Sequence, residues 1–261
     1  MIITIQYFQT ILKTKIIMAL FGSSNPFMKE EKFKGILDNE FATEAKMTVA
    51  GAVNKTLILT ALLLITSAIG FTMPNMMFIW VGGIGGLAAV LFASFKPHLS
   101  SYLAPAYALL EGLLLGTISA IYAAAFEGIV VNAFLSTVGI LVAMLLIYKS
   151  GVIAVTERFR MGVFAATASI AFVYLLSFVL SFFGIQIPYL HENTGMGILI
   201  SVAIIVVATL NLLVDFDNIK KGEMYGSPQY MEWFSAMGLL VTLIWLYLEM
   251  LRLLSKISRS R

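Results

Sequence analysis

Long apolar stretches separated by short polar segments make up most of the chain after residue 53. A bilayer core about 30 Å thick is crossed by roughly 20 apolar residues of helix. Backbone polar groups in lipid must be paired within the protein, so a membrane span is either a helix or a strand of a closed barrel. Barrel strands alternate polar with apolar residues, and these stretches do not, so the spans are expected to be helices. The pattern predicts seven spans, at about 56–72, 77–95, 102–125, 129–148, 161–183, 195–214 and 234–254.

The connections between these spans are short and contain residues that favour turns. These residues are Pro74 with Asn75, Pro97, Gly128, Gly151, Gly184 with Pro188, and Gly226 with Pro228. Such connections leave no room for a second domain. We therefore expect an all-α membrane bundle over 54–258, preceded by a charged N-terminal tail over 1–53.

The composition excludes several classes of protein. Hydrophobic residues make up 60% of the chain and charged residues 12%, whereas soluble domains have about 25% charged residues. The absence of cysteine rules out disulfides and thiolate metal sites. With a net charge of +3 and no basic run interleaved with aromatic residues, nucleic acid is not an expected partner. Membrane lipid is the expected environment.

The basic residues of the connections indicate an orientation. They all fall on one side: Lys96, Lys149, Arg158, Arg160, Lys220 and Lys221. Because the opposite connections have no Lys or Arg, the positive-inside rule places the N-terminus in the cytoplasm. Seven crossings then put Lys256, Arg259 and Arg261 outside, against the same rule, so the sequence leaves open whether the last segment crosses fully.

Charges inside spans are costly and are candidates for function. Glu111 lies in the third span beside Gly112, which forms a small-xxx-small pair with Gly116. For the glycines we favour a packing role. For Glu111 a role in an ion pathway and a structural role are equally open.

Asp215 ends the sixth apolar run, and Asp217 follows it. Two positions along a helix face about 200° apart, so the two carboxylates cannot point into one site. A structural role near Lys220 and Lys221 is as well supported as a role in an ion pathway or a pH sensor.

Glu249 and Arg252 are spaced three residues apart and share a helix face. We favour a structural ion pair over a role in transport. Motifs of hydrolases and nucleotide-binding proteins are absent, and the seventh span has no aspartate for intramembrane aspartyl proteolysis. We expect no enzymatic activity and no cofactor.

The C-terminal third carries a distinctive pattern: Asp215-Phe-Asp-Asn-Ile, then Gly226, Pro228 and Tyr230-Met-Glu-Trp, then Gly238 to Arg252. This pattern resembles the Bax inhibitor-1/YccA membrane protein family. Supporting matches are Met47-Thr-Val-Ala-Gly, Asn54-Lys-Thr, Glu111-Gly and Val155-Thr-Glu-Arg-Phe-Arg160. The resemblance covers roughly 45–254.

The resemblance implies a seven-helix bundle whose last helix is surrounded by the others. Some members are pH-sensitive calcium leaks, and a bacterial member modulates a membrane-bound AAA protease, which suggests a bacterial inner membrane here. In the leak-type members two aspartates on the last two helices form the pH sensor. Asp215 matches the first, but the second falls near the apolar Leu240. Asp217, Glu111 or Glu249 could replace it.

Two functions remain open. The first is a cation leak, in which oxygens of acidic side chains bind the transported calcium and protonation abolishes this binding. Asp215 is the expected principal carboxylate and calcium ligand. Its expected partner on the cytoplasmic side is Arg158 or Arg160. In the second, the charged tail binds and restrains a membrane protease. Deletion of the tail would separate them.

Overall fold

The computed structural model describes residues 45–184 and 194–259, and this part of the chain is all-helical. The helices are α3 (Val49–Thr72), α4 (Met76–Phe95), the 3₁₀ turn η1 (Pro97–Leu99), α5 (Ser100–Ala125), α6 (Ile129–Ser150), α7 (Glu157–Ser181), α8 (Gly195–Met224) and α9 (Tyr230–Arg259). Seven of them are long and apolar enough to cross a membrane. The predicted membrane bundle is confirmed.

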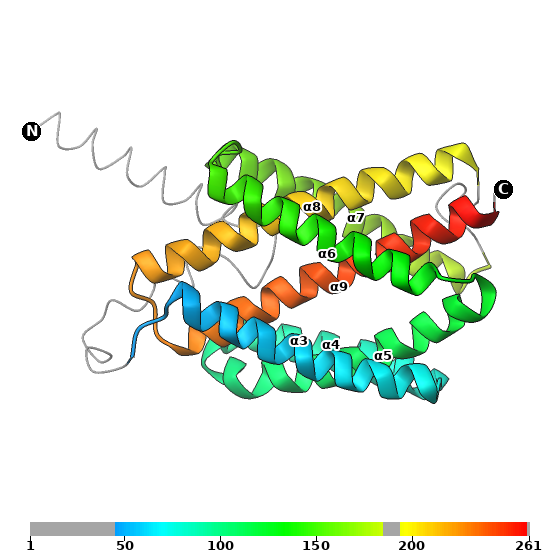
Figure 1. Ribbon diagram of the computed structural model, residues 1–261, viewed down its shortest axis with the longest axis horizontal. Helices are drawn as coiled ribbons and strands as arrows, with labels where there is room; N and C mark the ends of the chain where they lie inside the picture. The colour runs from blue at the N-terminus through cyan, green and yellow to red at the C-terminus, as the bar shows by residue number, and fades with distance from the viewer. Residues whose placement is uncertain (1–44, 185–193, 260–261) are drawn as a thin grey trace, which may run out of the picture.

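The last helix lies at the centre of the bundle. Figure 1 shows α9 running between a group formed by α3, α4 and α5 and a group formed by α6, α7 and α8. It packs against α3, α5, α6 and α8. Of its most apolar window 67% is buried, compared with 6% for α7, so α9 is the core helix and α7 a peripheral one.

Local chemistry explains where several helices begin. Thr48, Asn75, Thr156 and Thr194 are N-caps whose side-chain oxygens accept a hydrogen bond from a backbone N–H of the first turn. Gly128, before α6, has a φ of 70°, in the left-handed region that glycine adopts without strain. Of the residues named here, Asn75 and Gly128 are turn residues seen in the sequence, and both lie at helix boundaries.

The bounds of three helices differ clearly from the predictions. α8 continues to Met224 instead of ending near residue 214, and α9 extends beyond 234–254 at both ends. The reason is that polar residues in these extensions have partners on other helices. α3 begins at Val49, inside the expected tail of 1–53, of which residues 1–44 lie outside the described part of the chain.

The start of α3 is held against the corner between α8 and α9. Glu232 of α9 accepts hydrogen bonds from the backbone N–H and the hydroxyl of Thr48, both at 3.0 Å, and pairs with Lys55 at 2.9 Å. Glu223 of α8 accepts from the N–H of Val49 at 2.9 Å. Carboxylates at a helix N-terminus also interact favourably with its dipole.

We call the end of the bundle where α3 begins, close to the connection between α8 and α9, the proximal end. The end where α9 finishes is the distal end. At the distal end the guanidinium of Arg259 lies 5.4 Å from the ring centroid of Phe126, in the α5–α6 connection. α9 therefore crosses the whole bundle, and the first and last described residues lie at its opposite ends.

Small residues let α3 and α5 approach closely. A Cβ at Gly112 would overlap the side chain of Thr66, and a Cβ at Gly116 would overlap the backbone of Ser67 and Phe71. The packing role of both glycines is confirmed. Lipid tails are as apolar as most side chains of a membrane helix, so the hydrophobic effect does not drive helices together in lipid. Close van der Waals contact, as between α3 and α5, stabilises the helix pair instead.

We expect Gly116→Ala to destabilise the protein because its methyl group meets backbone atoms of α3, which cannot rotate away. Overpacking of this kind costs about 1–3 kcal/mol. The melting temperature of the purified protein in detergent should fall. Gly139→Ala is the matched control, because a Cβ there meets nothing within 4 Å. Equal shifts in the two variants would contradict close α3–α5 packing.

The topology can be tested with single cysteines, since the chain has none. Ser150 at the proximal end and Glu127 at the distal end are both exposed, one at each end of α6. We expect Ser150→Cys to react only with a reagent on the cytoplasmic side and Glu127→Cys only with one outside. Labelling of both from one side would contradict the crossing of α6.

Candidate functional site

The two aspartates of α8 point in different directions, as their spacing predicted. Asp215 is fully buried and faces α9, where the hydroxyl of Thr242 donates a hydrogen bond to Asp215 Oδ2 at 2.6 Å. Asp217 faces α6 and α7, and 16% of its side chain is exposed. One carboxylate is therefore inside the core, and the other is reached by solvent.

Asp217 belongs to a cluster at the proximal end. The guanidinium of Arg160 forms an ion pair with Asp217 Oδ2 and donates a hydrogen bond to Asn218 Oδ1 at 2.5 Å. Lys221 Nζ lies 3.3 Å from Asp217 Oδ2, and the hydroxyl of Tyr148 donates to Oδ1 at 3.3 Å. The cluster links α6, α7 and α8.

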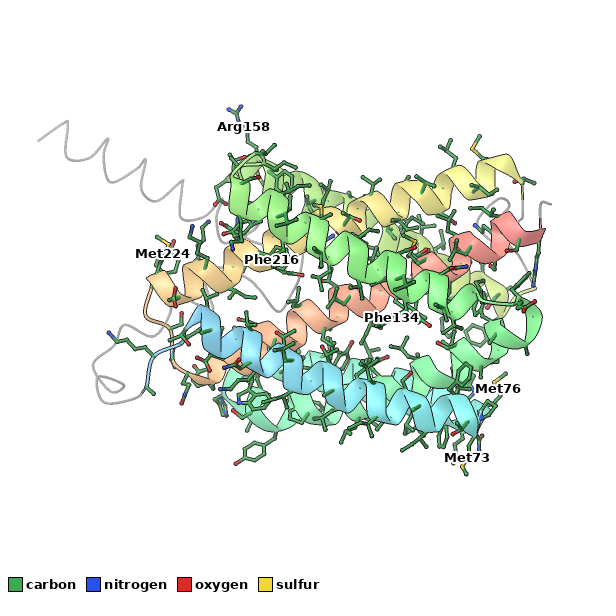
Figure 2. The ribbon with its side chains drawn as sticks, viewed as in Figure 1. Met73, Met76, Phe134, Arg158, Phe216 and Met224 are labelled. Carbon is green, nitrogen blue, oxygen red and sulfur yellow. The ribbon has the colours of Figure 1, made fainter. Side chains whose placement is uncertain are left out.

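The two arginines proposed as partners of an aspartate have different positions. Arg160 is fully buried. Arg158 is exposed and extends away from the bundle in Figure 2. Two residues apart at the start of α7, they face opposite sides of the helix. Arg160 meets Asp217, not the expected Asp215, in its ion pair.

Glu249 and Arg252 form an ion pair at 2.6 Å, and a residue of α7 joins them. The hydroxyl of Tyr174 donates to Glu249 Oε1 at 2.8 Å and also contacts the guanidinium of Arg252, whose Cζ lies 5.0 Å from the Tyr174 ring centroid. Glu249 is 1% exposed. The group links α7 to α9 in the distal half of the bundle.

Glu111 lies near the middle of α5 and is half-buried. Its carboxylate packs against Gly86 of α4 so closely that a Cβ at that glycine would overlap it. Within residues 45–184 and 194–259, Glu111 has no hydrogen bond or ion pair. The structure does not join it to either aspartate of α8.

The described residues contain no group of three His, Asp or Glu side chains that could hold a metal ion. Calcium takes six to eight oxygen ligands. Among the described residues, the predicted calcium ligand Asp215 therefore does not lie in such a group.

Sequence reasoning missed the neutral partners of these charges. Thr242, Tyr148, Tyr174 and Asn218 each contact a charged side chain on a neighbouring helix. Thr242 could have been found as a polar residue inside an apolar run. The tyrosines could not, because tyrosine is also common at membrane interfaces.

A protein-family model described as Bax inhibitor 1 like matches residues 25–259. The match includes the C-terminal pattern with Asp215, Glu249 and Arg252, and it confirms the resemblance seen in the sequence. No match was found among curated proteins or among solved structures.

The contact between Glu249 and Arg252 can be tested by a double-mutant cycle. Glu249→Gln leaves the partly buried guanidinium of Arg252 without its carboxylate, at a cost of about 2–4 kcal/mol. We expect it to lower the melting temperature more than the double variant Glu249→Gln with Arg252→Gln. Additive losses would show that the two charges are not coupled.

Proposed function

Because this chain belongs to the Bax inhibitor 1 like family, we propose that it is a pH-sensitive leak channel through which calcium passes down its gradient. The observation that carries this proposal is the carboxylate of Asp215, fully buried between α8 and the central helix. A charge inside a membrane bundle is costly and commonly marks an ion pathway.

The chemistry around Asp215 suits a hard divalent cation. The carboxylate of Asp215 and the hydroxyl of Thr242 bring oxygen atoms from α8 and α9 to within 2.6 Å of each other. Oxygen is the ligand that calcium prefers. The carboxylate of Asp215 supplies the negative charge that attracts the cation. Glu111, with its carboxylate unpaired in the described structure, is the second candidate on the pathway.

The ion pair of Arg160 with Asp217 supplies the element that responds to pH. α7 has little buried apolar surface, so this pair contributes strongly to holding its proximal end against α8. Protonation of Asp217 removes the charge that compensates the buried guanidinium, and an uncompensated buried charge is strongly destabilising. The pair therefore exists only while Asp217 carries its negative charge.

Part of the Asp217 side chain is exposed, so protons can reach it from solution. Its neighbours Lys221 and Tyr148 belong to the same cluster. Loss of the pair releases the proximal end of α7 and opens the pathway. Acidification therefore increases the leak. We propose a bacterial inner membrane with the proximal end in the cytoplasm, in accordance with the basic connections.

The sequence also left open the modulation of a membrane-bound protease without transport. That function would depend on the N-terminal tail, whose residues 1–44 lie outside the described part of the chain. The buried polar groups of the bundle favour the leak.

Calcium flux in liposomes separates the roles of the two aspartates. Asp217→Asn removes the charge as protonation does, so we expect its flux at neutral pH to rise to the level of the wild type at mildly acidic pH, with a flattened pH dependence. Asp215→Asn should lower the flux at every pH because it removes the cation ligand. An encapsulated calcium indicator gives the measurement.

Glu127→Gln is the control, since it neutralises an exposed carboxylate at the distal end. It should behave as the wild type. If Asp217→Asn keeps the normal pH dependence, the ion pair is not the pH-responsive element. If Asp215→Asn leaves the flux unchanged, Asp215 is not on the pathway.

A further inference from the structure

One face of α9 carries a polar residue at every seventh position. These residues are Ser235, Thr242, Glu249 and Lys256. Seven residues make almost two turns of a helix, so the four side chains lie along one stripe. The stripe extends over 21 residues, which is about 32 Å of helix and close to the thickness of the hydrocarbon core. All four residues are buried, with at most 4% of each exposed.

Two hydrogen bonds show that this stripe faces α8 and fix the register between the two helices. Thr242 donates to Asp215 Oδ2 at 2.6 Å, and Lys256 donates to the hydroxyl of Ser201 at 2.9 Å. From the first contact to the second, α9 advances by 14 residues while α8 goes back by 14 residues. The stripe is therefore the contact line of two antiparallel helices.

The same register pairs the two remaining polar residues of the stripe with small residues of α8. Ser235 lies opposite Gly222, and Glu249 lies opposite Ala208. We call the four levels from Ser235, near the proximal end, to Lys256, near the distal end, the α8–α9 seam. At two levels of this seam, an oxygen of α9 faces a position that has no side chain or only a methyl group.

The same two levels hold buried oxygens without a hydrogen-bond partner in the described part of the chain. The hydroxyl of Ser235 has none, and the residue is 0% exposed. Glu249 Oε1 accepts from Tyr174 and Arg252, whereas Glu249 Oε2 has no partner. A buried oxygen that stays unpaired lowers stability. Ordered water commonly satisfies such atoms inside proteins.

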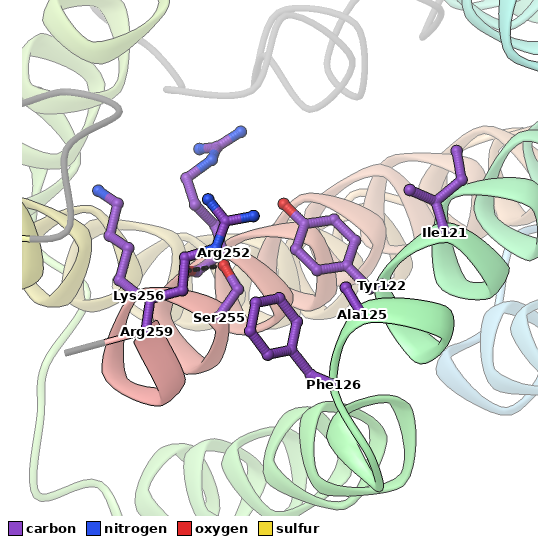
Figure 3. A pocket seen from close by; sticks show the side chains of 8 residues that line it. All are labelled: Ile121, Tyr122, Ala125, Phe126, Arg252, Ser255, Lys256 and Arg259. Carbon is purple, nitrogen blue, oxygen red and sulfur yellow. Dashed lines mark hydrogen bonds between the residues drawn. The ribbon is translucent and has the colours of Figure 1, made fainter. Parts of the chain in front are cut away.

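The distal end of the seam meets a cavity of about 320 Å³ between the ends of α5 and α9. Lys256 belongs both to the seam and to the lining of this cavity, which also includes Tyr122 and Arg252. Figure 3 shows these three side chains. A water molecule takes about 30 Å³ of the liquid, so the cavity has room for several. Water in the cavity therefore reaches the last level of the seam.

We propose that the α8–α9 seam binds a file of water molecules, held by the hydroxyl of Ser235 on one side of Asp215 and by Glu249 Oε2 on the other. Water suits both levels because it donates to an oxygen and fits where only a glycine or an alanine stands opposite. In the proposed leak, on which this role of the seam rests, the file is the route by which a cation reaches Asp215 from water.

Single cysteines test the hydration of the seam, since the chain has none. Ser235→Cys replaces only the unpaired oxygen by sulfur. Ser100→Cys is the matched control, because Ser100 is also 0% exposed but donates to the carbonyl of Pro97 at the start of α5. The full-length variants in lipid nanodiscs are treated at neutral pH with trimethylammonium-ethyl methanethiosulfonate, a charged thiol reagent, and mass spectrometry follows the rate of modification.

We expect Ser235→Cys to react about tenfold faster than Ser100→Cys, because a dry buried site has to open locally before the reagent reaches it. Adding Gly222→Ala to Ser235→Cys should slow the reaction, since the methyl group fills the space opposite the thiol. Gly139→Ala, whose Cβ meets nothing within 4 Å, should leave the rate unchanged. Equal rates for Ser235→Cys and Ser100→Cys, or no effect of Gly222→Ala, would overturn the proposal.

Calcium release from liposomes with the wild-type chain separates this result from the proposed function. Modification of Ser235→Cys without calcium release by the wild type would support a hydrated seam and contradict the leak. Calcium release without modification of Ser235→Cys would overturn the seam as the route and leave the leak in place.

Discussion

A polar side chain on a helix at the centre of a membrane bundle must find its partner inside the protein, because lipid offers none. α9 is that helix, and its polar residues contact several of its neighbours. Glu232 binds the start of α3, Thr242 binds Asp215 of α8, and the hydroxyl of Tyr247 lies 2.7 Å from that of Ser119 in α5. These contacts fix the rotation of the surrounding helices about α9.

The same constraint makes α7 different from the other helices. It has little buried apolar surface, and polar contacts join it to the core at two levels: Arg160 with Asp217 near the proximal end and Tyr174 with Glu249 in the distal half. Apolar packing does not depend on pH, whereas an ion pair does. In the proposed leak, loss of the Asp217 charge therefore acts on the helix with the smallest buried share of its apolar segment.

The sequence predicted the features that depend on one helix at a time. The length of the apolar runs gave the seven spans, and the helical period separated Asp215 from Asp217. It also placed Glu249 beside Arg252. Features that depend on two helices were not predictable. The ends of α8 and α9 were predicted too early in the chain because charged residues such as Asp217 and Lys256 are typical of the segments that flank a membrane span. In the structure these residues have partners on other helices. Which of Arg158 and Arg160 pairs with an aspartate of α8 depends on how α7 is rotated against α8, and the sequence does not show that rotation.

As proposed above, this bundle conducts calcium and protons control the flux. The most direct measurement is the release of calcium from liposomes that contain only the purified wild-type chain, compared with liposomes without protein, at neutral and at mildly acidic pH. We expect a release above that of the empty liposomes, and a larger one at the acidic pH. Release that equals that of the empty liposomes at both pH values would contradict it.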